Sequence, residues 1–293
     1  MNSLVSVIIS AYNHEKYIED CLRSIILQSY ENIELLVIDD GSSDATFNKI
    51  LTLKNECEKR FVRFVFEKQR NMGTRYSGNK LITKSKGKYL FFTASDDVVK
   101  PQTVKKLVGF LEQNPEYVLA VGDNEIINEN NDRIYWGNKR TIVKKEYAAF
   151  KTFGEELGLY TKHYNSFGEY SDLLKSNYIP NGYMIPRSCV LEVGMYDETI
   201  YLEDWYLILQ LAKLGKFKFF PEILYCYRWH SANTVKSIFF KKNQETFYRE
   251  IYLKEKEYCF KNGLSKQWKY CWSKRLGLRK KWNLFRQFVG LTK

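Results

Sequence analysis

The chain has 293 residues, of which 44% are hydrophobic and 27% are charged, and this balance is ordinary for a globular protein with a hydrophobic core. No apolar run approaches the roughly 20 residues that span a bilayer, so no membrane-spanning helix is expected in these residues. The formal net charge of +12 lies at one end: residues 236–293 carry 16 Lys or Arg and four Glu, whereas residues 1–235 carry 30 basic and 30 acidic residues.

Strand and helix signals alternate over residues 1–121. Short apolar runs, typical of buried parallel strands, predict strands at 5–10, 33–38, 62–66, 89–92 and 117–121. Apolar residues at helical spacing predict helices at 16–28, from about 44, around 75–83, and from Pro101 onward. Alternation of this length predicts an α/β fold, in which right-handed crossovers join the strands of a mostly parallel sheet.

Residues 122–178 are harder to interpret, and regular patterns return at Asn181–Arg187. The stretch 122–178 is rich in Asn, Lys, Glu and Tyr, and we expect helices and loops there that form the second wall of a cleft. Further elements are predicted beyond it: a short helix that ends at Val193, a longer helix at 201–214, and short strands at 217–220 and 223–228 on either side of Pro221.

The cysteines and the N-terminus favour a location in the cytoplasm. Six cysteines are scattered without a C-x-x-C pair, which argues against a zinc site and favours reduced thiols in the cytoplasm. Met1-Asn2-Ser3 leads into the first strand without a basic segment or a cleavage site, so no signal peptide is expected.

Two acidic pairs follow two of the predicted strands. Asp39-Asp40 come directly after strand 33–38, and Asp96-Asp97 come shortly after strand 89–92. Neighbouring acids repel each other, so each pair needs a compensating positive or hydrogen-bonding group. Ligands of open α/β sheets bind beyond the carboxyl ends of the strands, and the two pairs there suggest a site for a divalent cation and a nucleotide. The alternative for either pair alone is that it turns the chain and caps the next helix.

Four segments carry a combination of motifs. They are 5–13 (VSVIISAYN), 37–44 (VIDDGSSD), 95–97 (SDD) followed by Pro101, and 202–204 (LED). In this order and spacing they resemble family 2 glycosyltransferases, which are inverting enzymes with the GT-A fold. The resemblance covers roughly residues 3–235. It implies a GT-A, Rossmann-like domain over 1–235, with a nucleotide-sugar-binding half (1–121) and an acceptor half (122–235), followed by a basic, helical extension over 236–293.

The resemblance implies a metal-assisted donor site. Asp96 and Asp97 are expected to hold the metal and the ribose, although family members differ over which acid touches the ion, and Ala94 stands where an additional acid is common. A divalent cation, Mn²⁺ or Mg²⁺, would neutralise the charge that develops on the departing diphosphate. His230 resembles a histidine that many members place near the metal or diphosphate. The alternative for His230 is a hydrogen-bonded structural residue.

The resemblance also implies how the nucleotide base is recognised. Asp40 corresponds to a carboxylate that accepts the N3–H of uracil, which thymine also carries and cytosine lacks. An unpaired buried acceptor costs roughly 1–3 kcal/mol, so UDP or dTDP donors are expected over CDP donors. Tyr12 either lies against the base as an aromatic face or packs in the core. Asp39 is expected to bond to nearby backbone.

Asn79 aligns with the family's loop before the metal strand. Gly78 stands where an arginine usually precedes that asparagine, and Arg75 could reach the diphosphate instead. A solvated helix residue is the alternative for Arg75. His14 and His163 carry no comparable signal.

Glu203-Asp204 form a third acidic pair, at the start of a predicted helix. An inverting transfer needs a base on the acceptor side, opposite the leaving group, that takes the proton of the attacking hydroxyl. Asp204 matches that position in the family and is the expected catalytic base. The alternative is an acidic pair at a helix start, favoured by the helix dipole.

The extension 236–293 interleaves aromatic rings with Lys and Arg. Such a composition can bind an anionic membrane surface or nucleic acid. We expect attachment to the membrane, with packing against the catalytic domain or a second subunit as the alternative. A homo-oligomer is therefore possible, and nucleic acid is not expected.

These patterns together lead to a functional hypothesis. The chain is expected to be a metal-dependent hexosyltransferase that moves a sugar from a UDP-sugar to a hydroxyl of a glycan or lipid-linked acceptor. The expected pathway is cell-surface polysaccharide synthesis, such as lipopolysaccharide or capsule. The expected place is the cytoplasm, peripheral to the inner face of the cell membrane. The alternative is a non-catalytic nucleotide-sugar or membrane-binding module with the same fold.

Overall fold

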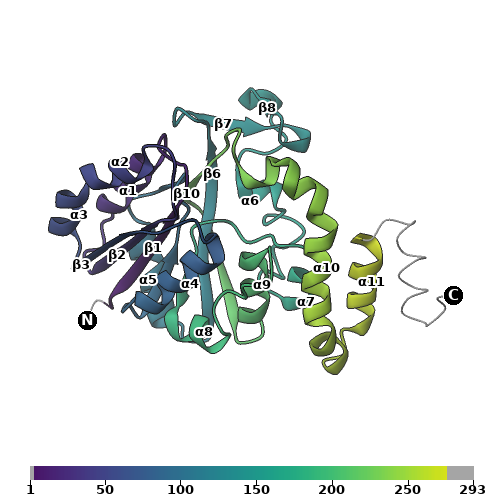
Figure 1. The fold of residues 1–293 in the computed structure, drawn as a ribbon. Helices are drawn as coiled ribbons and strands as arrows, with labels where there is room; N and C mark the ends of the chain where they lie inside the picture. The colour runs from purple at the N-terminus through teal and green to yellow at the C-terminus, as the bar shows by residue number, and fades with distance from the viewer. Residues whose placement is uncertain (1–2, 276–293) are drawn as a thin grey trace.

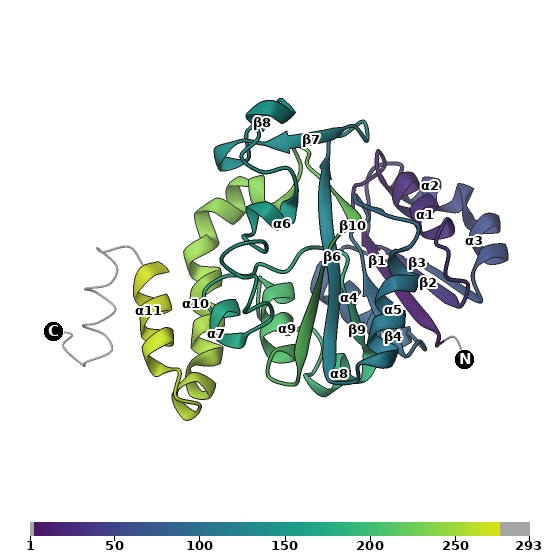
Figure 2. The same ribbon diagram turned by 180° about the vertical axis from the view of Figure 1, so that it is seen from behind.

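The computed structural model describes residues 3–275, in which helices cover both faces of a central β-sheet (Figures 1 and 2). The strands are β1 Val5–Ala11, β2 Ile33–Asp39, β3 Arg63–Lys68, β4 Tyr89–Phe92, β5 Val98–Val99, β6 Tyr117–Ile127, β7 Arg133–Trp136, β8 Ile142–Val143, β9 Met184–Pro186 and β10 Lys216–Arg228. The α-helices are α1 Ile18–Ile26, α2 Thr46–Thr52, α3 Lys54–Arg60, α4 Thr74–Lys84, α5 Thr103–Gln113, α6 Phe153–Glu156, α7 Tyr170–Leu173, α8 Arg187–Glu192, α9 Glu203–Leu211, α10 Ile238–Lys261 and α11 Ser265–Arg275. Short 3₁₀ turns lie at η1 Asn138–Arg140, η2 Lys145–Tyr147 and η3 Thr234–Lys236.

The sheet has the strand order β3-β2-β1-β4-β9-β6-β10-β5, and β7 and β8 extend from β6. Strands β3, β2, β1 and β4 pair in parallel, as do β6 and β10. The short β9 joins these two parallel groups in antiparallel register. The predicted α/β class, a mostly parallel sheet with flanking helices, is confirmed.

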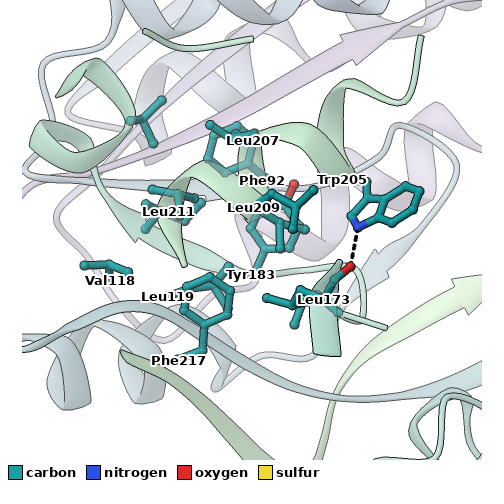
Figure 3. Packing of buried hydrophobic residues seen from close by; sticks show 14 of the residues in the cluster. Phe92, Val118, Leu119, Leu173, Tyr183, Trp205, Leu207, Leu209, Leu211 and Phe217 are labelled. Carbon is teal, nitrogen blue, oxygen red and sulfur yellow. Dashed lines mark hydrogen bonds between the residues drawn. The ribbon is translucent and has the colours of Figure 1, made fainter. Parts of the chain in front are cut away.

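Strands β1, β2 and β4 are buried on both faces because alternate side chains enter two different cores. Val7 enters a core with α1, α2, α3 and α5, whereas its neighbour Ile8 enters a core with α4, α8, α9 and the C-terminal helices. Figure 3 shows the second core around Trp205, whose Nε1 donates to the carbonyl of Leu173 at 2.8 Å. Burial on both faces explains why these strands are continuous apolar runs in the sequence.

The structure of residues 122–235 differs from the prediction in two places. Strand β6 does not end at residue 121 but runs to Ile127 and turns back through β7 and β8, where only helices and loops were expected; Ile126 packs there in a third core with Ile134 and Trp136. The two strands expected around Pro221 are one strand, β10. Its register against β6 shifts next to the proline, and this irregularity accommodates a residue that has no N–H to donate.

The first helices of the extension, α10 and α11, pack on the rest of the described chain. The rings of Tyr201 and Phe247 stack with centroids 3.8 Å apart, and the ring of Trp205 meets Tyr248 edge-on at 5.4 Å. Helices α10 and α11 therefore confirm the predicted helical character, and many of their rings are covered by protein rather than left for lipid. Trp282, Phe285 and Phe288, which also belong to the aromatic residues of the predicted extension, lie outside the described residues.

Candidate active site

A cavity of about 420 Å³ lies beyond the carboxyl ends of β1 and β4. Its walls come from α4, the segment 179–183, the start of α9 and the loop after β10. Four acids line it, Asp96, Asp97, Glu203 and Asp204, and no lysine or arginine among the described residues does so. The cavity, called the cleft below, is therefore acidic, and no lysine or arginine of the described lining balances its carboxylates.

Asp96 stands beside two histidines. Its Oδ2 lies 2.9 Å from His230 Nε2 and 3.9 Å from His14 Nε2, and His14 Nδ1 is held by the Oγ of Ser95 at 2.7 Å. Burial raises the pKa of Asp96, but the hydrogen bond from His230 and the nearby His14 outweigh it and hold that pKa below its ordinary value. One potential ligand atom from each of the three residues lies within 4.8 Å of the others, as a shared cation requires.

Asp97 is held differently. Its Oδ2 accepts hydrogen bonds from the hydroxyl of Tyr225 at 3.0 Å and from Nδ2 of Asn181 at 3.2 Å, and its Oδ1 accepts the N–H of Arg228 at 2.8 Å. Burial and the charge of Asp96 raise the pKa of Asp97 well above its ordinary value. The repulsion within the pair is thus relieved because the two neighbours have different protonation preferences.

The side chain of Arg228 is buried behind this loop. Its Nε donates to the carbonyl of Asp96 at 2.6 Å, its Nη1 donates to the carbonyl of Asn128 at 3.1 Å, and its Nη2 lies 3.3 Å from the carboxylate of Asp20. A single guanidinium therefore ties the acidic loop to α1 and to the end of β6. This fixes the backbone that presents Asp96 to the cleft.

Glu203 and Asp204 begin α9 on the opposite wall of the same cleft. Asp204 is open to the cavity; its Oδ1 accepts the N–H of Trp205 at 2.7 Å, and its Oδ2 accepts from Nδ2 of Asn177 at 3.2 Å. Burial at the cleft wall raises the pKa of Asp204. Burial and the adjacent Asp204 raise the pKa of Glu203 to about 8. The structure therefore brings the predicted base into one cavity with the predicted donor acids.

The residues expected at the nucleotide base lie outside the lining of the cleft. Asp40 is buried; its Oδ1 accepts from Gln69 Nε2 at 2.8 Å and from the N–H of Met72 at 2.9 Å, and its Oδ2 accepts the N–H of Gly73 at 2.8 Å. Tyr12 is 46% exposed, so it is not the packed core aromatic of the alternative interpretation.

Asp39 does not bond to nearby backbone as expected. Both of its carboxylate oxygens are buried and have no hydrogen-bond partner among the described residues, and the Nζ of Lys68 lies 4.0 Å away. The side chain alternates to the opposite face of the strand end from Asp40, so the two neighbours meet different surroundings.

Asn79 and Arg75 hold a loop rather than line the cleft. The amide of Asn79 donates to the carbonyl of Tyr196 and accepts its N–H, both at 2.9 Å. Arg75 Nη1 donates to the carbonyl of Ile200 at 3.0 Å. A Cβ on Gly78 would come within 2.6 Å of the Tyr196 ring. The place of the family's usual arginine is thus filled by an aromatic ring that lines the cleft.

Two site residues were not predicted from the sequence. His14 follows β1, the strand that pairs with β4, and its place one residue beyond the motif 5–13 was the signal that could have found it. Arg228 ends β10, and only the pairing of β10 beside the acidic loop shows its role.

The fold is also found in solved structures. TarS 1-349 of S. aureus, in complex with UDP-GlcNAc, superposes with a TM-score of 0.63 at 17% identity, over 85% of this chain and 66% of that chain. The mannosyltransferase PcManGT from Pyrobaculum calidifontis, in complex with GDP-Man and Mn²⁺, gives a TM-score of 0.61 at 14% identity, over 88% and 65%. The chain spans about two thirds of the length of these neighbours, and the likeness defines a GT-A fold.

Sequence comparison then gives the family. Residues 6–171 match the model of glycosyl transferase family 2. An uncharacterized glycosyltransferase of Haemophilus influenzae is 32% identical over 247 residues, which cover 83% of this chain and 70% of the relative. Glycosyltransferase GlyG of Streptococcus pneumoniae is 24% identical over 244 residues, 82% and 75% of the two chains. The chain belongs to glycosyl transferase family 2.

Proposed function

We propose that the chain is an inverting, metal-dependent hexosyltransferase that moves a sugar from a UDP-sugar to a hydroxyl of a glycan or lipid-linked acceptor in cell-surface polysaccharide synthesis. One observation carries the proposal: His14, Asp96 and the pair Glu203-Asp204 line the same cavity, and His230 lies 2.9 Å from Asp96. The solved neighbours with UDP-GlcNAc and with GDP-Man support a nucleotide-sugar donor. Family membership supports a glycosyl transfer.

Asp204 is proposed as the base. Its carboxylate is open to the cleft, and a pKa raised by burial brings it nearer to the operating pH, where a general base is most effective. Trp205 and Asn177 each donate to one of its oxygens, so the carboxylate is oriented before the acceptor arrives. In this position it takes the proton of the acceptor hydroxyl as that oxygen attacks the sugar.

His14, Asp96 and His230 are proposed to hold the divalent cation. The donor set fits, because one ligand atom from each of the three residues lies within 4.8 Å of the others and the described lining of the cleft has four acids and no lysine or arginine. Two imidazoles and one carboxylate suit Mn²⁺ better than Mg²⁺, which prefers oxygen ligands. When bound, the cation neutralises charge on the departing diphosphate. Asp97 accepts hydrogen bonds from Tyr225, Asn181 and Arg228, and its pKa is raised well above the ordinary value; it is proposed to support the site from behind rather than to ligate.

Asp40 and Tyr12 are proposed to read the uracil. A carboxylate offers about four acceptor sites, and Asp40 uses three of them for the loop at 69–73, so one remains for the N3–H of the base. Tyr12 has an exposed ring that can cover the base face. Asn79 and Arg75 are proposed to act on the donor side only through the loop at 196–200 that they hold.

A panel of nucleotide sugars tests the proposal. The purified chain is incubated with UDP-, dTDP-, GDP- and CDP-sugars in Mn²⁺, Mg²⁺ or chelator, and nucleotide release is measured. Release from UDP-sugars that requires a divalent cation is the expected result. Donor binding without release under any condition would instead support the non-catalytic module.

A further inference from the structure

A strip of exposed apolar residues borders the cleft. The strip, called the cleft lip, is residues 235–242, with the sequence VKSIFFKK. It begins inside the site, since Thr234 and Val235 line the cleft, and continues as the first turn of α10. Ile238 is 72% exposed and Phe239 is 57% exposed, which is unusual for two adjacent large apolar side chains on a structured helix.

The lip is held in place firmly. Ser237 caps α10, because its Oγ accepts the N–H of Phe240 at 3.1 Å. The rings of Phe240 and Phe247 pack on Tyr201, with centroids 6.4 Å and 3.8 Å away, and one side of the Phe239 ring contacts Tyr201 as well, at 5.6 Å. Since these contacts hold the helix on the domain, Ile238 and Phe239 are exposed by the fold itself and not by a frayed end.

The lip is also basic. It carries Lys236, Lys241 and Lys242, and no acidic residue occurs from 235 to 244. Lys241 and Lys242 are exposed, and on a helix they lie three and four positions from Ile238, on its side. Aliphatic and aromatic groups flanked by lysines suit the boundary between lipid headgroups and acyl chains, where the ammonium groups reach the phosphates.

A second patch of the same kind lies beside the lip. In the segment 138–147, Ile142 is 60% and Tyr147 is 74% exposed, and Lys144 and Lys145 are exposed as well. Trp229 links the two regions, because the Nζ of Lys236 and the Cζ of Arg140 lie 3.6 Å and 5.6 Å from the centroid of its ring. Figures 1 and 2 show β8 and the start of α10 at the same end of the molecule.

We propose that the cleft lip and the segment 138–147 together bind the anionic surface of a membrane, with Ile238 and Phe239 inserted among the headgroups. This orientation places the mouth of the cleft at the lipid surface, where an acceptor carried by that membrane meets the base. The inference rests on the proposed function, which supplies the reason for the contact. It assigns membrane binding to two defined segments rather than to the whole basic extension 236–293. Charge complementarity selects the occupant, because each lysine near an anionic leaflet contributes to binding.

Vesicle co-sedimentation of the full chain tests the proposal. The vesicles are phosphatidylcholine alone and phosphatidylcholine mixed with phosphatidylglycerol. The apolar variant is Ile238→Ser with Phe239→Ser, and the charge variant is Lys241→Glu with Lys242→Glu. The matched controls are Leu253→Ser, an exposed apolar residue further along α10, and Lys105→Glu, an exposed lysine on α5.

The wild type is expected to bind the mixed vesicles and to bind phosphatidylcholine weakly. Each lip variant should have a partition coefficient on mixed vesicles that is lower by about tenfold or more. Both control variants should keep the wild-type partition coefficient. All variants should release nucleotide from a soluble donor at the wild-type rate. The proposal is overturned if the lip variants bind the mixed vesicles as the wild type does. It is also overturned if they keep vesicle binding and lose only transfer to a soluble acceptor, because the lip would then be a glycan-binding surface.

Vesicle binding is measured without any sugar, so the two proposals fail separately. A chain that binds anionic vesicles through the lip but releases no nucleotide would contradict the proposed function and leave the membrane surface standing.

Discussion

The three acidic pairs of the sequence have different surroundings in the structure. Asp39 and Asp40 diverge to opposite faces of a strand end, Asp96 and Asp97 share one loop with unlike protonation preferences, and Glu203-Asp204 open a helix. The sequence places all three at strand or helix ends, but the role of each acid depends on the partner that it meets. For Asp96 that partner is His230, which lies 134 positions away.

At the residue scale, the assignment of the base gives the first prediction. Asp204→Asn keeps the shape of the side chain but removes its capacity to take a proton, so kcat is expected to fall roughly 10²–10⁴-fold while donor affinity stays the same. The matched isostere Glu203→Gln should lose far less, because Glu203, with a pKa of about 8, is mostly protonated at neutral pH already. The reverse order of losses in a steady-state assay would move the base to Glu203.

The pH dependence of turnover is the second prediction. A base works only when ionised, and burial raises the pKa of Asp204, so activity is lost as pH falls through that raised pKa. The acid limb of kcat/KM should therefore lie above the ordinary Asp value of about 3.9, and Glu203→Gln should keep the limb in the wild-type position. A wild-type profile that stays flat down to the ordinary carboxyl range would contradict a base with a raised pKa.

At the element scale, helix α10 depends on one buried charged group. The carboxylate of Glu255 accepts hydrogen bonds from the hydroxyl of Tyr170 and from the side-chain amide of Gln210, the latter at 2.7 Å. It also forms a salt bridge with the Nζ of Lys213 at 2.7 Å. These partners come from α7 and from α9 with the turn that follows it. A buried carboxylate is stabilised only if its partners are complete, so this group fixes where α10 docks.

The third prediction compares two ion pairs of that helix. Lys213→Ala leaves Glu255 buried without its cation and should lower the free energy of unfolding by about 3–5 kcal/mol. The control Lys254→Ala breaks an ion pair with Asp197 in which the lysine is 44% exposed, and it should change stability by about 0–1 kcal/mol. Equal effects of the two variants in chemical denaturation would show that Glu255 does not anchor α10.

Elements buried on both faces could be predicted from the sequence, and elements defined by their pairing could not. Strand β4, Tyr89–Phe92, begins and ends as predicted, because every side chain in it is buried. Strand β9 has only three residues, too few for a periodic pattern, and it exists because β4 and β6 both pair with it. The same limit hid Arg228, whose contacts span three elements.

At the scale of the whole molecule, the charge is separated. Residues 236–293 carry the excess of basic residues, whereas the described lining of the cleft has four acids and no lysine or arginine. The cleft lip is the place where the two regions meet. A nucleotide diphosphate bound as proposed would enter an acidic cavity past a basic rim, and no lysine or arginine of the described lining would neutralise it there.

The fourth prediction follows from this charge separation. Because like charges repel in a cavity of low dielectric, UDP should bind weakly in chelator and at least tenfold more tightly with Mn²⁺, as measured by calorimetry without any turnover. His14→Gln should raise the Mn²⁺ concentration at which this gain is half complete, whereas His163→Gln, which changes a buried histidine outside the cleft lining, should leave it unchanged if the melting temperature is preserved. Tight UDP binding in chelator would mean that a cationic side chain outside the described lining reaches the diphosphate. It would contradict the proposal that a cation at Asp96 is needed to neutralise the diphosphate.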